Sequence, residues 1–132
     1  MSDLIEFLRA RLNEDEQAAL GISDTWHVED YEVTAQADGA VQASWVVAGP
    51  RGEVGVAMVN GVRRAHHIAR HDPARVLREV EAKRRIIAEH EPGQDPCDAH
   101  DAMFETVPCD TLMELAAVYA DHPDYREDWR VT

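Results

Sequence analysis

The sequence predicts a single α+β domain over residues 1–132, with an N-terminal helix, a three-stranded antiparallel meander, further helices and a metal-clipped loop. Two observations predict this class. Apolar residues recur at helical spacing near both ends of the chain but alternate in the middle, and turn-forming residues divide the alternating part into short segments. The chain is 45% hydrophobic and long enough to bury a core of its own.

The first segment, residues 1–20, is predicted to form an amphipathic helix that starts at Ser2. Gly21 is a suitable residue to stop it. Its apolar residues recur three and four positions apart, as one face of a helix requires, and they are Leu4, Ile5, Phe7, Leu8 and Leu12.

The next segment, residues 25–59, has the alternating pattern of β-strands. Asp38-Gly39 is a strong hairpin signal between a first strand region and a strand over 41–47. The turn residues 49–52 then separate that strand from a third over 53–59. Sequential strands with short turns predict an antiparallel meander with helices on one face.

Helices are predicted again over residues 61–90. A short helix over 61–70 is followed by Asp72-Pro73, which combines a good N-cap with a good first helical residue. The second helix extends to about Glu89, because Pro92-Gly93 ends it.

The last segment, residues 110–132, is predicted to contain a helix over 111–120 and an aromatic tail. Thr111 and Glu114 have capping-box spacing. We expect Trp129 to pack in the core with Tyr125 positioning it, rather than to form a partner-recognition patch.

A candidate metal site lies around the loop 91–109. His90, Cys97, His100 and Cys109 follow one another as H-x6-C-x2-H-x8-C, and thiolates with imidazoles are the donors of tetrahedral zinc sites. A Cys2His2 set has no open position, which predicts a structural zinc rather than a catalytic one. His122 is the alternative to His90 as fourth ligand, and buried cysteines without metal are the alternative to the site as a whole.

The charge of the chain is unevenly distributed. The net charge is −13, made up of −8 over residues 1–60, +4 over 61–90 and −9 over 91–132. Such an acidic chain is repelled by nucleic acid and by anionic membranes, so we expect neither as a partner. The basic segment predicts a surface for a protein partner, with Arg75, Arg78 and Arg85 as the expected contacts.

Two other features suggest alternative functions. His67 and His71 are one helical turn apart and precede Asp72, so the three residues would suit a metal-dependent hydrolase. The acidic surface would suit an inhibitor that mimics nucleic acid. Asp72 is already explained as an N-cap, and we find no nucleophile motif or phosphate loop. These observations favour a non-enzymatic binding or regulatory protein.

The compartment is predicted from the cysteines and from the start of the chain. Only two cysteines occur, and no basic, apolar leader is visible after Met1. A reducing cytoplasm, in which thiols bind metal or stay free, is the expected location.

Four stretches of the chain resemble a known family. They are residues 4–16 (LIEFLRARLNEDE), 67–85 (HIARHDPARVLREVEAKRR), 108–112 (PCDTL) and 119–129 (YADHPDYREDW). They resemble an uncharacterised domain family of small proteins from actinobacteria and their phages. The resemblance implies a cytosolic setting, and it supplies no activity. It also implies a Cys-x2-Cys or Cys-x2-His pair before the Pro-Cys step, which is the position of Cys97 and His100 here.

Overall fold

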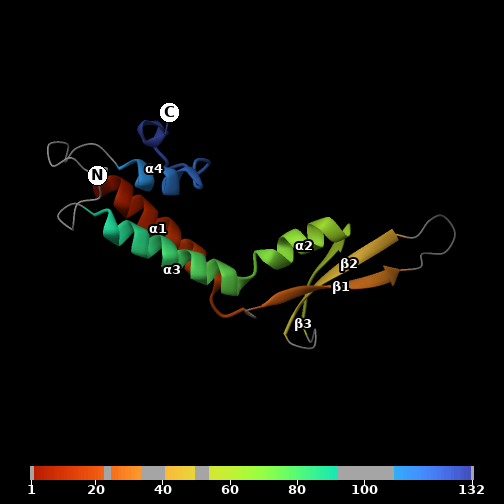
Figure 1. Cartoon of the computed structure of the whole chain (residues 1–132). Helices are drawn as coiled ribbons and strands as arrows, with labels where there is room; N and C mark the ends of the chain where they lie inside the picture. The colour runs from red at the N-terminus through yellow and green to blue at the C-terminus, as the bar shows by residue number, and fades with distance from the viewer. Residues whose placement is uncertain (1, 23–24, 34–40, 50–53, 92–108, 132) are drawn as a thin grey trace. The chain divides into compact units, whose positions relative to one another are not determined.

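The computed structural model describes residues 2–22, 25–33, 41–49, 54–91 and 109–131 (Figure 1). The chain has the predicted α+β fold. Its elements are α1 (Ser2–Ala19), β1 (Trp26–Val33), β2 (Val41–Ala48), β3 (Val54–Asn60), α2 (Val62–Arg70), α3 (Pro73–Glu89), α4 (Asp110–Ala117) and a short 3-10 helix, η1 (Glu127–Trp129). Within these residues no helix is both long and apolar enough to cross a membrane.

The fold divides into two compact units. A helical unit comprises Met1–Ala18 with Glu79–Thr132, and a sheet unit comprises Ala19–Arg78. The helical unit is therefore made from both ends of the chain, whereas the sheet unit is continuous in sequence.

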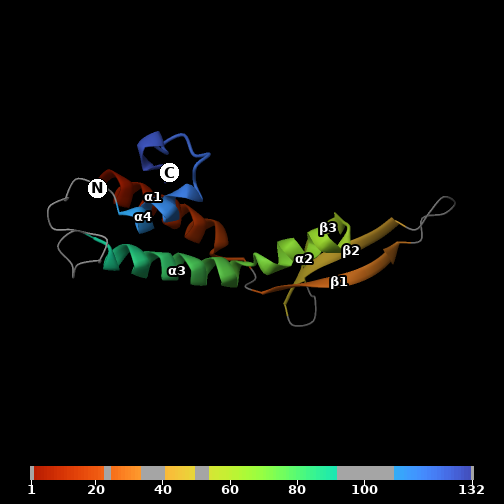
Figure 2. The ribbon, with the colours of Figure 1, turned by 45° about the horizontal axis from the view of Figure 1, so that its top comes forward.

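In the helical unit, α1 and the later part of α3 run side by side in opposite directions (Figures 1 and 2). Leu4, Leu8 and Leu12 lie on one face of α1 and are at most 1% exposed, as their helical spacing predicts. Arg84 of α3 joins the two helices, because its Nη2 lies 2.7 Å from both Glu16 Oε2 and Asn13 Oδ1 of α1.

The core of the helical unit is completed by α4 and the tail. Leu112 and Ala116 of α4 are fully buried, and Trp129 is 4% exposed, which confirms the predicted packing of the tail. The Phe7 ring of α1 lies 5.0 Å from the Trp129 ring, measured between centroids. The last helix begins at Asp110 rather than Thr111 and ends at Ala117, after which turns continue to His122.

The N-cap predicted for this helix is wrong. Cys109 is the N-cap residue, with extended backbone angles, and no side chain bonds to the cap. Thr111 lies inside the first turn, so its capping-box spacing with Glu114 is not used. Asp110 instead places a carboxylate in the first turn, where the helix dipole favours negative charge.

The sheet unit contains the predicted meander in the order β1-β2-β3, with both pairs antiparallel. Val28 pairs with Val46, and Val46 pairs with Ala57, so these residues share one face. Helix α2 covers that face and buries Ala65 and Ala69 against Val46. The predicted turn at Asp38-Gly39 lies outside the described residues, as does most of the turn over 49–52.

Asp72 begins α3 as the sequence predicts. Its Oδ1 accepts a hydrogen bond from the Arg75 amide at 2.8 Å, which is the bond of an N-cap. Its Oδ2 accepts from the Trp26 amide at 3.3 Å. The carboxylate thus joins the start of β1 to the start of α3 within the sheet unit.

Candidate functional site

The candidate metal site is formed where α3 ends and α4 begins. His90 directly follows α3, and its amide donates to the Ile87 carbonyl at 3.1 Å. Cys109 directly precedes α4, and its carbonyl accepts from the Met113 amide at 3.0 Å. Helix geometry at two chain positions therefore fixes the backbone of both residues.

The side chains of this pair meet. Cys109 Sγ lies 3.3 Å from His90 Nδ1, within hydrogen-bond reach, and Cys109 is a free, buried thiol. Two ligands of one tetrahedral zinc, with Zn–S near 2.3 Å and Zn–N near 2.1 Å, would place these atoms about 3.6 Å apart. The pair fits both a hydrogen bond and a shared metal ion with a shift of a few tenths of an ångström.

Only half of the predicted ligand set lies within the described residues. Cys97 and His100 fall in the stretch 92–108, outside them. In the part of the chain that is described, no group of three or more His, Cys, Asp or Glu side chains is placed to hold a metal. The structure thus brings His90 and Cys109 together, and the complete Cys2His2 site stays a prediction.

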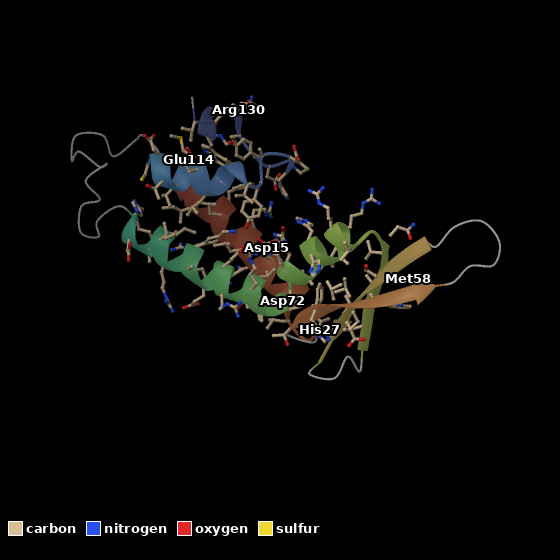
Figure 3. The ribbon with its side chains drawn as sticks, turned by 45° about the vertical axis from the view of Figure 1, so that its right-hand side comes forward. Asp15, His27, Met58, Asp72, Glu114 and Arg130 are labelled. Atoms are coloured by element: carbon tan, nitrogen blue, oxygen red, sulfur yellow. The ribbon has the colours of Figure 1, made fainter. Side chains whose placement is uncertain are left out.

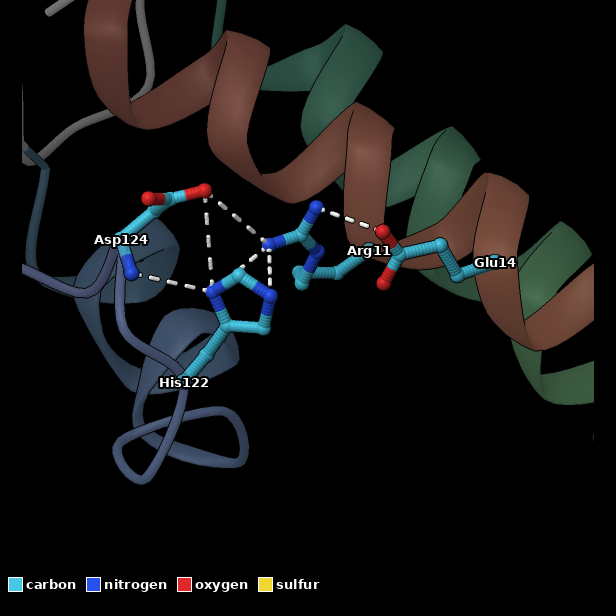
Figure 4. Close-up of polar contacts among 4 residues, drawn as sticks. All are labelled: Arg11, Glu14, His122 and Asp124. Atoms are coloured by element: carbon cyan, nitrogen blue, oxygen red, sulfur yellow. Dashed lines mark hydrogen bonds and ion pairs between the residues drawn. The ribbon is translucent and has the colours of Figure 1, made fainter.

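The alternative fourth ligand, His122, has a different environment (Figure 4). Its Nδ1 lies 2.7 Å from Nη1 of Arg11 and accepts from the Asp124 amide at 3.1 Å. The same Arg11 nitrogen also contacts His122 Nε2. Of the two candidates, His90 is therefore the one beside Cys109.

Arg11 is the centre of a polar cluster that the sequence analysis missed. Its side chain is only 9% exposed, and its Nη2 donates to Glu14 Oε1 at 2.7 Å (Figure 4). Its Nη1 lies 3.8 Å from Asp124 Oδ2, and its guanidinium carbon is 5.2 Å from the centre of the Phe7 ring. A signal was present in the sequence, because Arg11 follows Leu4 and Leu8 at helical spacing and thus belongs to the apolar face.

A second buried contact joins α1 to the turn after α4. The Tyr119 hydroxyl donates to Asp15 Oδ2 at 2.5 Å. Burial raises the pKa of Tyr119, and the hydrogen bond to Asp15 raises it further. Together with the Arg11 cluster, this bond fixes the C-terminal segment onto α1.

The three residues considered for a metal-dependent hydrolase, His67, His71 and Asp72, are only partly brought together in the structure. The His67 and His71 rings stack with centroids 4.5 Å apart, but His71 Nδ1 lies 2.7 Å from the His67 carbonyl oxygen. Both oxygens of Asp72, which is labelled in Figure 3, accept backbone hydrogen bonds, from Arg75 and Trp26. Asp72 is thus occupied with the structural role of an N-cap.

The arginines predicted to bind a partner have three different environments. Arg85, in the helical unit, forms an ion pair with Glu81 at 2.9 Å. Arg75, in the sheet unit, donates from Nη1 to the Arg70 carbonyl at 3.2 Å. Arg78 is exposed and forms no ion pair with a described residue. Their role in binding a partner stays a prediction.

Comparison with known proteins places the chain in a family. Residues 1–131 match a family described as a family of unknown function, DUF6221. The chain belongs to this family. The match extends over both the helical unit and the sheet unit of this chain. No curated protein and no solved structure matches the chain.

Proposed function

We propose that this DUF6221 protein is a small, non-enzymatic binding or regulatory protein of the cytoplasm, held by a structural zinc and acting through a protein partner. The observation that carries the zinc proposal is the 3.3 Å approach of Cys109 Sγ to His90 Nδ1. Two predicted ligands from opposite ends of the loop 91–109 thus lie side by side.

The donor set favours a structural role for the metal. Cys97 and His100 would complete a Cys2His2 set, which leaves zinc no open position for water or substrate. The ion would tie the end of α3 to the start of α4 and restrain the chain between them. A ligand pair at two helix ends is the placement that such a restraint needs.

The contacts of Asp72 favour binding over hydrolysis. A metal-dependent hydrolase at His67 and His71 would need this carboxylate, yet both its oxygens accept backbone hydrogen bonds. The acidic mimic of nucleic acid receives no comparable support, because many acids of the helical unit are ion-paired within the chain.

Metal analysis with matched variants tests the zinc proposal. Protein purified without added metal should contain stoichiometric zinc, which Cys97→Ser and Cys109→Ser remove. Ser is a preferred N-cap residue, so Cys109→Ser keeps the start of α4 favourable and separates loss of metal from loss of the helix. His90→Gln should lower the zinc content, whereas His66→Ala, at an exposed position of α2, should leave it unchanged.

Chelation gives the second readout. A chelator should lower the melting temperature of the wild type but not that of Cys109→Ser. Absence of zinc from the wild type, together with melting unaffected by chelator, would refute the structural-zinc proposal.

A further inference from the structure

We propose that the free edge of β3 and the adjoining side of α2 form a docking surface for an extended acidic segment of a protein partner. This inference rests on the proposed role as a binding protein and names the surface and the chemistry of its partner. It does not depend on zinc.

The surface includes an open groove between α2 and β3. Val59 and Ile68 are half-buried in it, and its exposed polar residues are Arg63, Arg64 and His67, of which the two arginines carry positive charge. Helix α2 covers one face of the sheet (Figures 1 and 2), and the groove residues Val59 and Ile68 pack against the core of that face. An apolar base with guanidinium groups beside it suits a ligand that carries carboxylates next to apolar groups.

Arg63 and Arg64, the arginines of this groove, have no carboxylate partner in the described part of the chain, as is also true of Arg70 and Arg78. Neither Arg63 nor Arg64 forms an ion pair or a side-chain hydrogen bond within the described residues. By contrast, every described Lys or Arg of the helical unit lies within 4.0 Å of a carboxylate, namely Arg9, Arg11, Lys83, Arg84, Arg85, Arg126 and Arg130. In a chain of net charge −13, unpaired arginines beside a groove provide charge complementary to an acidic partner.

The edge of the sheet supplies the second part of the surface. β3 pairs only with β2 among the described strands, so its outer backbone groups have no strand partner there. Edge strands are usually protected by charged residues or proline. β3 (VGVAMVN) contains neither, although its register with β2 shifts between Ala57 and Gly55, whereas β1, the other edge (WHVEDYEV), carries three acids.

The exposed side chains of β3 are apolar. Met58 is 62% exposed and Val56 is 37% exposed. Met58 lies between Ala57 and Val59, which pack against the core beneath α2, so by alternation along the strand it lies on the opposite face of the sheet. An added strand would thus meet cationic side chains on one face of the sheet and Met58 on the other.

These features of the surface specify the kind of ligand that it would bind. Backbone pairing with β3 requires an extended peptide, and alternate side chains of such a peptide point to opposite faces. Acids at every second position would reach Arg63, Arg64 and His67, and apolar residues between them would pack beside Met58. Nucleic acid lacks the backbone donors and acceptors for strand pairing and is repelled by the net charge.

Fluorescence anisotropy with the full-length protein tests the proposal. The probe is a labelled peptide of alternating Glu and Val, and the comparison peptide has the same composition with Glu and Val in separate blocks. The alternating peptide should bind at least about tenfold more tightly than the block peptide. The double variant Arg63→Gln/Arg64→Gln should weaken its binding about tenfold or more, because it removes the charge-assisted contacts of both guanidinium groups.

Arg70→Gln is the matched control. Arg70 is an exposed arginine of the same helix, without an ion pair in the described part of the chain, and it does not line the groove. Its substitution should change the affinity by less than about twofold. Amides of β3 should also exchange more slowly with solvent when the alternating peptide is added, a change that charge attraction alone does not produce.

Several results would overturn the proposal. Equal binding of the two peptides, or equal weakening by Arg70→Gln, would show attraction to charge without strand addition. Tighter binding of a single-stranded oligonucleotide than of the alternating peptide would assign the groove to nucleic acid. Dimerisation of the wild type that the double variant abolishes would assign the edge to a second copy. Zinc content should be unchanged in the double variant, so failure here is distinct from failure of the zinc proposal.

Discussion

The guanidinium of Arg11 lies against the imidazole of His122, with Nη1 2.7 Å from Nδ1 across a separation of 111 residues. Arg11 belongs to the apolar face of α1, where an unpaired charge would be strongly unfavourable. Glu14 and Asp124 supply the opposite charge, and the His122 ring lies against the guanidinium, so the first helix and the C-terminal segment depend on each other.

Replacing Arg11 should destabilise the protein even when the charge is kept. Arg11→Lys cannot donate to His122 and Glu14 at once, because an ammonium lacks the planar fork of a guanidinium. We expect a loss of about 1–3 kcal/mol in the free energy of unfolding, measured by urea denaturation. Glu14→Gln alters the exposed partner of the same cluster and should cost less than about 1 kcal/mol. A Lys variant as stable as the wild type would contradict this account.

Tyr119 should make stability depend on alkaline pH. Its pKa is raised in the folded state, so above about pH 10 the unfolded chain loses this proton while the folded protein retains it. The contribution of Tyr119 is therefore complete below that pH and is lost as pH rises through the higher folded pKa. Tyr119→Phe should cost about 1–2 kcal/mol at pH 7 through loss of the Asp15 bond.

Ultraviolet titration of tyrosinate provides the measurement for Tyr119. The wild type should show one tyrosine ionising later than in the unfolded chain, and this late component should be absent from Tyr119→Phe. If the two titration curves have the same shape, the hydroxyl is not held as described.

Glu16 should make the stability of the protein depend on acidic pH. Its hydrogen bond with Arg84 lowers the pKa of Glu16, so its stabilising effect is present above the unfolded value near 4.3 and declines as pH falls through the lower folded value. Glu16→Gln should unfold more easily than the wild type at pH 7, and the difference should shrink by pH 3. Glu6→Gln, an exposed position of the same helix, controls for removing one negative charge. A difference in stability that is constant from pH 7 to pH 3 would rule out a stabilising effect of the Glu16–Arg84 hydrogen bond.

Gly61 should tolerate a side chain poorly although space is available for it. Its φ is +96°, and a Cβ there would meet nothing within 4 Å, so the cost of Gly61→Ala is backbone strain alone, about 1–2 kcal/mol. Gly55→Ala is the control, because its Cβ would make an ordinary 3.7 Å contact with the Trp45 ring. Thermal melting should show a clear loss for position 61 and a change below about 1 kcal/mol for position 55. Equal losses at the two positions would be evidence against strain at Gly61.

Local signals were sufficient to predict most elements. The helix over Pro73–Glu89 is bounded by Asp72-Pro73 and Pro92-Gly93, and both signals depend only on neighbouring residues. The start of α4 was misjudged because the Thr111–Glu114 spacing fits a capping box, although the helix begins one residue earlier. Spacing identifies residues that are able to cap, but packing decides which of them does so.

The candidate site required contacts that no local signal contains. Cys109 and His90 were predicted from their donor atoms, with His122 as the alternative to His90, since each of the two histidines follows a predicted helix. Their environments differ because His122 meets Arg11, from the other end of the chain. The groove beside β3 was not predicted for the same reason, since it depends on which arginines find carboxylates in the folded protein.

The division of the helical unit between the two ends of the chain has a consequence for synthesis on the ribosome. The sheet unit has all its residues once position 78 has emerged, whereas α1 must wait for α4 and the tail, which are translated last. Until then, α1 can pack on α3 but lacks α4 and the tail, so its apolar face with Leu4, Leu8 and Leu12 is incompletely covered. Chains released from the ribosome before completion should therefore contain a folded sheet unit and an N-terminal helix with an exposed apolar face. Chaperones bind segments of this kind.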